Sequence, residues 1–222
     1  MPEQFAGDKK VGKNFFARRE TALVTAGLPY IPRWLETYHL TLMTIIWSAG
    51  VIGFGYLAQN NFLWLLGTSS MIILQYLTDL FDGAIGRQRQ TGLIKWGYYM
   101  DHFLDYIFLC SLLIGYAFVI PNTFFNMYFF ILALLGSFLV NSYLAFATTN
   151  RFRIAYLGIG PTEIRGIFLG VNLLLIIFKK TYLAQSLPVI LLLALIGLII
   201  VVYRTQKEIW QMDMHDKYLE PA

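Results

Sequence analysis

The sequence predicts an all-α integral membrane protein, a bundle of six transmembrane helices preceded by an amphipathic juxtamembrane segment. Of its 222 residues, 57% are hydrophobic and only 14% are charged, whereas about a quarter of a soluble domain is charged. Several uncharged stretches reach the length of a bilayer span, which needs roughly 20 mainly apolar residues. The lysines and arginines between these stretches fall mostly in alternate loops, which predicts how many times the chain crosses the membrane and in which direction.

The N-terminal segment 1–38 differs from the rest of the chain. It mixes basic residues with Phe15, Phe16, Leu23 and Val24, a mixture typical of a helix that lies on an anionic membrane surface, with a disordered arm as the alternative. It lacks the single apolar core and the small-residue cleavage site of a signal peptide. We therefore expect this segment to remain on the mature protein.

Six apolar stretches follow in order. The expected spans are 40–57, 62–80, 96–120, 124–146, 166–178 and 187–203. The third ends just before Pro121, and the Pro-Asn pair that begins there is typical of a turn. The fifth is short for a span, so we expect its helix to begin at Pro161 and to continue through Leu183, with two lysines reaching the interface.

The basic residues support six crossings with the N-terminus inside. All 17 lysines and arginines except Lys179 and Lys180 then fall on the cytoplasmic side, where such residues concentrate in membrane proteins. Residues 39–204 would form the transmembrane catalytic domain and 205–222 a cytoplasmic tail, with both termini in the cytoplasm. This topology explains the net charge of +4, so nucleic acid is not an expected partner.

Four of the five carboxylates in the range 37–207 are aspartates of one stretch, 79–105. They are Asp79, Asp82, Asp101 and Asp105. The first two are spaced i and i+3 and the last two i and i+4, so helices would place each pair on one face. Two like charges about 4 Å apart repel by about 4 kcal/mol at an effective dielectric constant of about 20. The cluster therefore predicts either partial protonation or a bound divalent cation.

The residues around the aspartates indicate phosphate chemistry. Oxygen ligands favour magnesium, calcium or manganese, and a two-ion site suits phosphoryl transfer. Arg87 can pair with phosphate oxygens. Gly83, Gly86 and Gly97 would leave room for a nucleotide against the backbone, although close packing of membrane helices is the alternative for glycines.

The stretch 79–105 resembles the signature of the CDP-alcohol phosphotransferases. The family pattern is DxxDGxxAR, eight or nine residues, then GxxxDxxxD. Here DLFDGAIGR is followed by nine residues and by GYYMDHFLD. The one departure is Gly86, where the family has alanine. The resemblance implies a membrane enzyme of phospholipid synthesis that transfers a substituted phosphate group from a CDP-alcohol to an acceptor alcohol and releases CMP.

The resemblance also implies roles for single residues. Asp79, Asp82 and Asp101 would hold a pair of Mg²⁺ or Mn²⁺ ions that bind the diphosphate of the donor. Asp105 would belong to the same metal set and act as the general base. GPTEIR, residues 160–165, is similar to a segment before the fifth span of some members. Its Arg165 becomes a candidate second phosphate ligand, with a cytoplasmic anchor as the alternative.

The resemblance leaves the substrates open. The short chain and the GPTEIR segment favour CDP-diacylglycerol as donor, whereas the Asp101-His102 pair favours the branch that transfers from CDP-choline or CDP-ethanolamine to diacylglycerol. Inositol phosphate, glycerol phosphate, serine and choline remain candidate acceptors. The active site is expected at the cytoplasmic boundary of the bilayer, and a homodimer is implied by the resemblance alone.

Two rival functions come from other classes of protein. An aspartate-rich membrane prenyltransferase would also use magnesium and a diphosphate, but it usually brings a second acidic motif on a later helix, and after Asp105 only Glu163 and the tail carry carboxylates. A divalent-cation carrier would need ligands midway through the bilayer. The aspartates instead cluster at one expected boundary, which favours the phosphotransferase.

Overall fold

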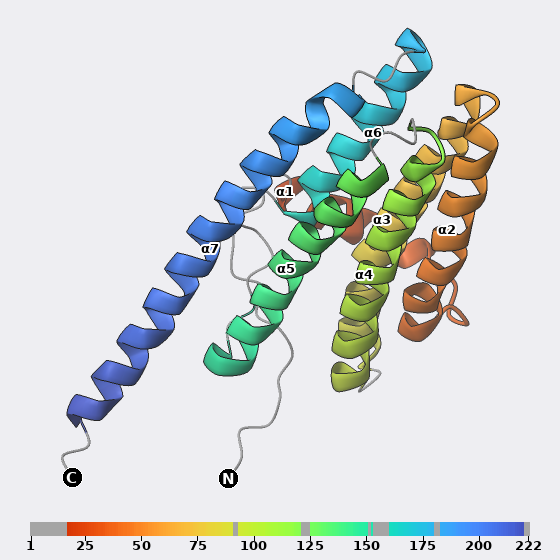
Figure 1. Cartoon of the computed structure of the whole chain (residues 1–222). Coiled ribbons are helices and arrows are strands. Elements are labelled where there is room, and N and C mark those ends of the chain that lie inside the picture. The colour runs from red at the N-terminus through yellow and green to blue at the C-terminus, as the bar shows by residue number, and fades with distance from the viewer. Residues whose placement is uncertain are drawn as a thin grey trace.

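The computed structural model is a bundle of long helices that run alternately up and down (Figure 1). It describes residues 17–90, 93–120, 125–150, 152, 160–179 and 183–219. The elements are α1 (Ala17–Gly27), η1 (Leu28–Tyr30), α2 (Thr37–Ala58), η2 (Phe62–Trp64), α3 (Leu65–Arg89), α4 (Ile94–Ala117), α5 (Phe125–Thr149), α6 (Pro161–Phe178) and α7 (Leu183–Leu219). All regular structure in the described ranges is helical, so the predicted all-α class is confirmed.

Five of the described helices are long and apolar enough to cross a membrane. They are α2, α4, α5, α6 and α7. Helix α3 has 25 residues, about 37 Å at 1.5 Å per residue, so its length suffices. It falls short in apolarity because the charges of Asp79, Asp82, Arg87 and Arg89 lie within it. The integral membrane bundle is confirmed, and the count of six spans stays a prediction.

The C-terminal ends of α3 and α6 differ from those expected. Helix α3 continues to Arg89 rather than ending near residue 80, which places the first two aspartates inside a helix. Helix α6 begins at Pro161 as expected but ends at Phe178 rather than Leu183. Lys179 takes a left-handed conformation there, with φ of 51°, and its N–H donates to the Leu175 carbonyl at 3.0 Å, which closes the helix.

The last helix is longer than the apolar stretch from which it was predicted. Helix α7 runs for 37 residues, from Leu183 to Leu219. The segment expected as a separate tail after Arg204 is therefore a continuation of the same helix up to Leu219. At the other end of the chain, α1 confirms a helix within the N-terminal segment, while Phe15 and Phe16 lie outside the described residues.

Helix α2 is the centre of one half of the bundle, because it packs against both α3 and α4. The crossing with α4 is close: a Cβ on Gly55 would lie 2.6 Å from the Cα of Gly115. Small residues allow such backbone approach in membrane proteins. Below the crossing, a buried cluster joins the three helices through Val51, Ile72 and Phe108.

A group of neutral polar side chains, the buried Tyr116 and Asn172 with the half-buried Ser69, joins α3, α4 and α6. We call it the neutral triad. The Tyr116 hydroxyl donates to Oδ1 of Asn172 at 2.6 Å, and Nδ2 of Asn172 donates to the Ser69 hydroxyl at 2.9 Å. Asn172 is 0% exposed. Hydrogen bonds of this kind between helices help to fix their relative position in a bilayer.

Candidate active site

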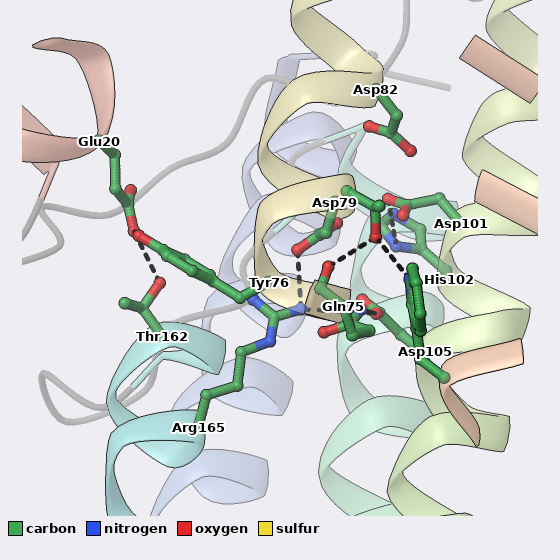
Figure 2. Close-up of polar contacts among 12 residues, drawn as sticks. Glu20, Gln75, Tyr76, Asp79, Asp82, Asp101, His102, Asp105, Thr162 and Arg165 are labelled. Carbon is green, nitrogen blue, oxygen red and sulfur yellow. Dashed lines mark hydrogen bonds and ion pairs between the residues drawn. The ribbon is translucent and has the colours of Figure 1, made fainter. Parts of the chain in front are cut away.

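Three of the four predicted metal ligands come together. One carboxylate oxygen from each of Asp79, Asp82 and Asp101 lies within 4.8 Å of the others. The first two side chains come from α3 and the third from α4, and the helical spacings predicted from the sequence place them on facing surfaces (Figure 2). We call these three side chains, with Asp105, the acidic cluster.

Asp82 is held in place from α2. Its carboxylate Oδ2 accepts a hydrogen bond from the Thr41 hydroxyl at 3.1 Å, and its backbone carbonyl accepts one from Thr37 at 3.3 Å. The residue is only 8% exposed. Burial of a carboxylate is costly unless hydrogen bonds or a cation compensate it, and the threonine supplies part of that compensation.

Asp105 lies one helical turn after Asp101 on α4. Its Oδ1 accepts a hydrogen bond from Nε2 of Gln75 at 3.1 Å and lies 3.7 Å from a guanidinium nitrogen of Arg165. Gln75 is 1% exposed, so the amide is held by its surroundings. The contact fixes the orientation of the carboxylate that the sequence predicts to be the general base.

Arg165 reaches the acidic cluster from α6. Its Nη2 lies 2.7 Å from Oδ2 of Asp79, and its side chain is 12% exposed. The guanidinium carbon lies 5.6 Å from the centre of the Tyr76 ring, within the range of a cation–π contact. The side chain therefore points into the site, an orientation that argues against a simple anchor at the membrane surface.

The glycines of the motif leave space beside the backbone. A Cβ on Gly97 would meet nothing within 4 Å. A Cβ on Gly83 would meet only the guanidinium of Arg87, at 3.4 Å, and that arginine is exposed. Gly86 follows one turn later on the same helix. Close helix packing therefore does not account for Gly83 or Gly97.

His102 forms a second candidate group with its neighbours. One ligand atom from each of Asp101, His102 and Asp105 lies within 4.8 Å of the others. The Nδ1 of His102 is 3.6 Å from Oδ2 of Asp101. Its ring stacks on Phe152 and meets the edge of Tyr98, both at 4.5 Å between centroids.

The sequence pattern did not single out several polar residues that contact the site. They are Glu20, Thr41, Gln75, Tyr76 and Thr162. Local signals existed for Gln75 and Tyr76, which lie on α3 at positions i−4 and i−3 relative to Asp79 and so share its side of the helix. Glu20, Thr41 and Thr162 belong to other helices, and no local spacing connects them with the motif.

An acidic cluster that draws on two helices, with an arginine from a third, defines a membrane-embedded protein with a site suited to divalent cations and phosphates. A family model described as CDP-alcohol phosphatidyltransferase matches residues 31–204. The chain belongs to this family, which confirms the resemblance of the aspartate motif. Comparison with curated proteins and with solved structures gave no match.

Family membership establishes the kind of reaction. The protein is a phosphotransferase that uses a CDP-alcohol donor and an alcohol acceptor in a membrane, and the family depends on divalent metal. The aspartate groups are compatible with this dependence. The prenyltransferase and the cation carrier are therefore disfavoured as readings of the acidic cluster.

Proposed function

We propose that the protein transfers a substituted phosphate group from CDP-diacylglycerol to a polar alcohol, with Asp79, Asp82 and Asp101 holding two Mg²⁺ or Mn²⁺ ions. The observation that carries the proposal is the approach of the three carboxylates to within 4.8 Å. An all-oxygen ligand set suits these hard cations, which complete their coordination with water and phosphate oxygens. When bound, the ions would neutralise the diphosphate and the charge of departing CMP.

In this proposal Asp105 is the general base and completes the acidic set. Its carboxylate takes the proton of the acceptor hydroxyl as that oxygen bonds to the phosphorus of the transferred phosphate group, the one that carries diacylglycerol. The bond between this phosphorus and the CMP oxygen breaks, and CMP leaves. Gln75 and Arg165, which contact Oδ1 of Asp105, would orient the carboxylate for this proton transfer.

The nucleotide would lie against α3 and α4. The open backbone at Gly83 and Gly97 supports this placement, with Gly86 extending the same surface and Arg87 pairing with phosphate. Arg165 is proposed as a second phosphate ligand. Arginine has five N–H donors, so one side chain can serve both Asp79 and a phosphate oxygen.

The donor and the orientation rest on sequence features. The GPTEIR segment supports CDP-diacylglycerol, and the distribution of lysine and arginine supports a site at the cytoplasmic boundary with both termini on that side. A lipid donor would enter sideways between helices, while a soluble alcohol arrives from water. The Asp101-His102 pair keeps CDP-choline or CDP-ethanolamine transfer to diacylglycerol as the second candidate. A homodimer stays a prediction.

The decisive experiment measures CMP. Purified protein is incubated with CDP-diacylglycerol and, in separate reactions, inositol phosphate, glycerol phosphate, serine and choline, with Mg²⁺ or Mn²⁺. A parallel reaction contains CDP-choline and diacylglycerol. We expect metal-dependent CMP release in the first series and a phospholipid identified by its mass. CMP release only in the parallel reaction would overturn the assignment of the donor, and none in any reaction would overturn the proposed function.

A further inference from the structure

Glu20 on α1 lies before the range that the family model matches, yet it contacts two helices of the site. Its Oε1 accepts a hydrogen bond from the Tyr76 hydroxyl at 3.1 Å and another from the Thr162 hydroxyl at 2.8 Å. Tyr76 belongs to α3 and Thr162 to the first turn of α6. Figure 2 shows this contact beside the acidic cluster. One carboxylate oxygen thus joins three helices.

Helix α1 has a second attachment to α3. A Cβ on Gly27, the last residue of α1, would lie 2.6 Å from the Phe81 ring. Phe81 directly precedes Asp82 in the sequence. The two attachments, at Glu20 and at Gly27, are about two helical turns apart. They therefore fix both the position and the direction of α1 against the helix that carries the first two aspartates.

Tyr76 connects the Glu20 contact with the acidic cluster. Its hydroxyl is held by Glu20, while its ring lies 5.6 Å from the guanidinium carbon of Arg165. Arg165 in turn pairs with Asp79 at 2.7 Å. A hydrogen bond to a charged acceptor is roughly twice as strong as a neutral one, so Glu20 restrains the ring against which the guanidinium rests.

From these contacts we infer that Glu20 is a positioning residue for phosphotransfer. Through Tyr76 it holds the guanidinium of Arg165 in the orientation that contacts Asp79 and approaches Asp105. The N-terminal helix is then part of the working site, although it precedes the matched range. The inference rests on the roles proposed above for Asp79, Asp105 and Arg165.

A double-mutant cycle on the full chain tests this inference. Glu20→Ala and Tyr76→Phe both remove the hydrogen bond, while phenylalanine keeps a ring beside Arg165. With the substrate pair that releases CMP in the parent, we expect each variant to lower kcat about five- to tenfold. Because both changes break the same contact, the double variant should be no slower than about the slower single variant.

Two further measurements separate positioning from a loss of folding. Hydrogen exchange should show faster exchange of the α1 amides in both single variants, with Tm within about 2 °C of the parent. Glu20→Gln keeps a carbonyl acceptor and should recover most of the lost rate. Matched changes on α7, Tyr203→Phe and Glu208→Ala, remove the same groups away from the site and should leave kcat unchanged.

The outcomes are distinguishable. An inactive parent would overturn the proposed function. An active parent whose Glu20→Ala and Tyr76→Phe variants match it in kcat would overturn the positioning role. So would rate losses that multiply in the double variant, or losses that follow the amount of folded protein.

Discussion

The neutral triad draws on α3, α4 and α6, as does the acidic cluster when its partner Arg165 is included, but the two differ in how their polar groups are balanced. In the triad, Asn172 receives from Tyr116 and donates to Ser69, and all three groups are uncharged. In the acidic cluster, carboxylate oxygens of Asp79, Asp82 and Asp101 lie within 4.8 Å of one another, and the positive charge of Arg165 lies beside Asp79 and Asp105. The groups of the triad are paired without charge, and the Tyr116 hydroxyl also contacts the Phe168 carbonyl at 3.2 Å.

This difference indicates that the neutral triad stabilises the packing of the helices, whereas the acidic cluster takes part in the reaction. A satisfied neutral network inside a bundle stabilises the arrangement of its helices. An excess of like charge destabilises the same arrangement until a cation is present. The two groups should therefore respond in opposite ways to substitution and to metal.

The largest expected effect is that of Asp105→Asn. Asparagine keeps the shape of the side chain but cannot take the proton, so kcat for CMP release should fall by about 10²- to 10⁴-fold. Binding of the CDP donor, measured by isothermal titration calorimetry, should change by less than about threefold. A variant that keeps the parental kcat would remove Asp105 from the mechanism.

The next largest effect is the stabilisation by Mg²⁺, which should depend on the acidic cluster and not on the neutral triad. Mg²⁺ at about 100 times its dissociation constant should stabilise the parent by about 2.7 kcal/mol, visible as a rise in Tm that EDTA reverses. The rise should disappear in the combined Asp79→Asn, Asp82→Asn and Asp101→Asn variant. It should persist in Asn172→Leu. A metal response in the combined aspartate variant would place the ions elsewhere.

Without metal, removing a polar group from the neutral triad should destabilise the protein, whereas removing a charge from the acidic cluster should not. Asn172→Leu removes the donor to the Ser69 hydroxyl and one of two acceptors of the Tyr116 hydroxyl, the other being the Phe168 carbonyl, and should cost about 1–2 kcal/mol of unfolding free energy. Asp82→Asn relieves like-charge repulsion and should raise Tm or leave it unchanged. Thermal unfolding in EDTA measures both, and equal destabilisation by the two changes would contradict the proposed imbalance of charge.

The smallest effect is expected from Gly97→Ala. The new methyl group has open space and alanine favours a helix by about 1 kcal/mol over glycine, so Tm should not fall. If the nucleotide lies against this backbone, KM for the CDP donor should rise about two- to fivefold. The matched change Gly53→Ala, on α2, also meets nothing within 4 Å and should leave KM unchanged.

Much of the fold and of the acidic cluster could be predicted because their causes are local. Apolar stretches of bilayer length and the i, i+3 and i, i+4 spacing of aspartates depend on short segments of chain. The ends of the helices were harder to predict from the sequence. Arg89 is held at the end of α3 by contacts with a distant part of the chain. Its guanidinium donates to carbonyls of residues 31–35, which lie before α2, including that of Leu35 at 2.7 Å.

Apart from Gln75 and Tyr76, which precede Asp79 by about one turn of α3, the supporting residues of the site could not be predicted from spacing. Gln75 contacts Asp105 across 30 positions and Arg165 contacts Asp79 across 86. Glu20 and Thr162 are separated by 142. These contacts arise from the way α1, α3, α4 and α6 pack, and no periodicity within one segment encodes them. The sequence motif predicts the four aspartates, whereas the residues that orient them are found only in the tertiary structure.

The length of α7 has a practical consequence for locating the protein in its membrane. Its 37 residues extend about 55 Å, while the hydrocarbon core of a bilayer is about 30 Å thick. If α7 crosses the bilayer, close to half of its length therefore lies outside the hydrocarbon core and is still helical. A fluorophore attached at Gln211, in the polar part of the helix, would show by its response to a membrane-impermeant quencher on which side of the membrane that part lies.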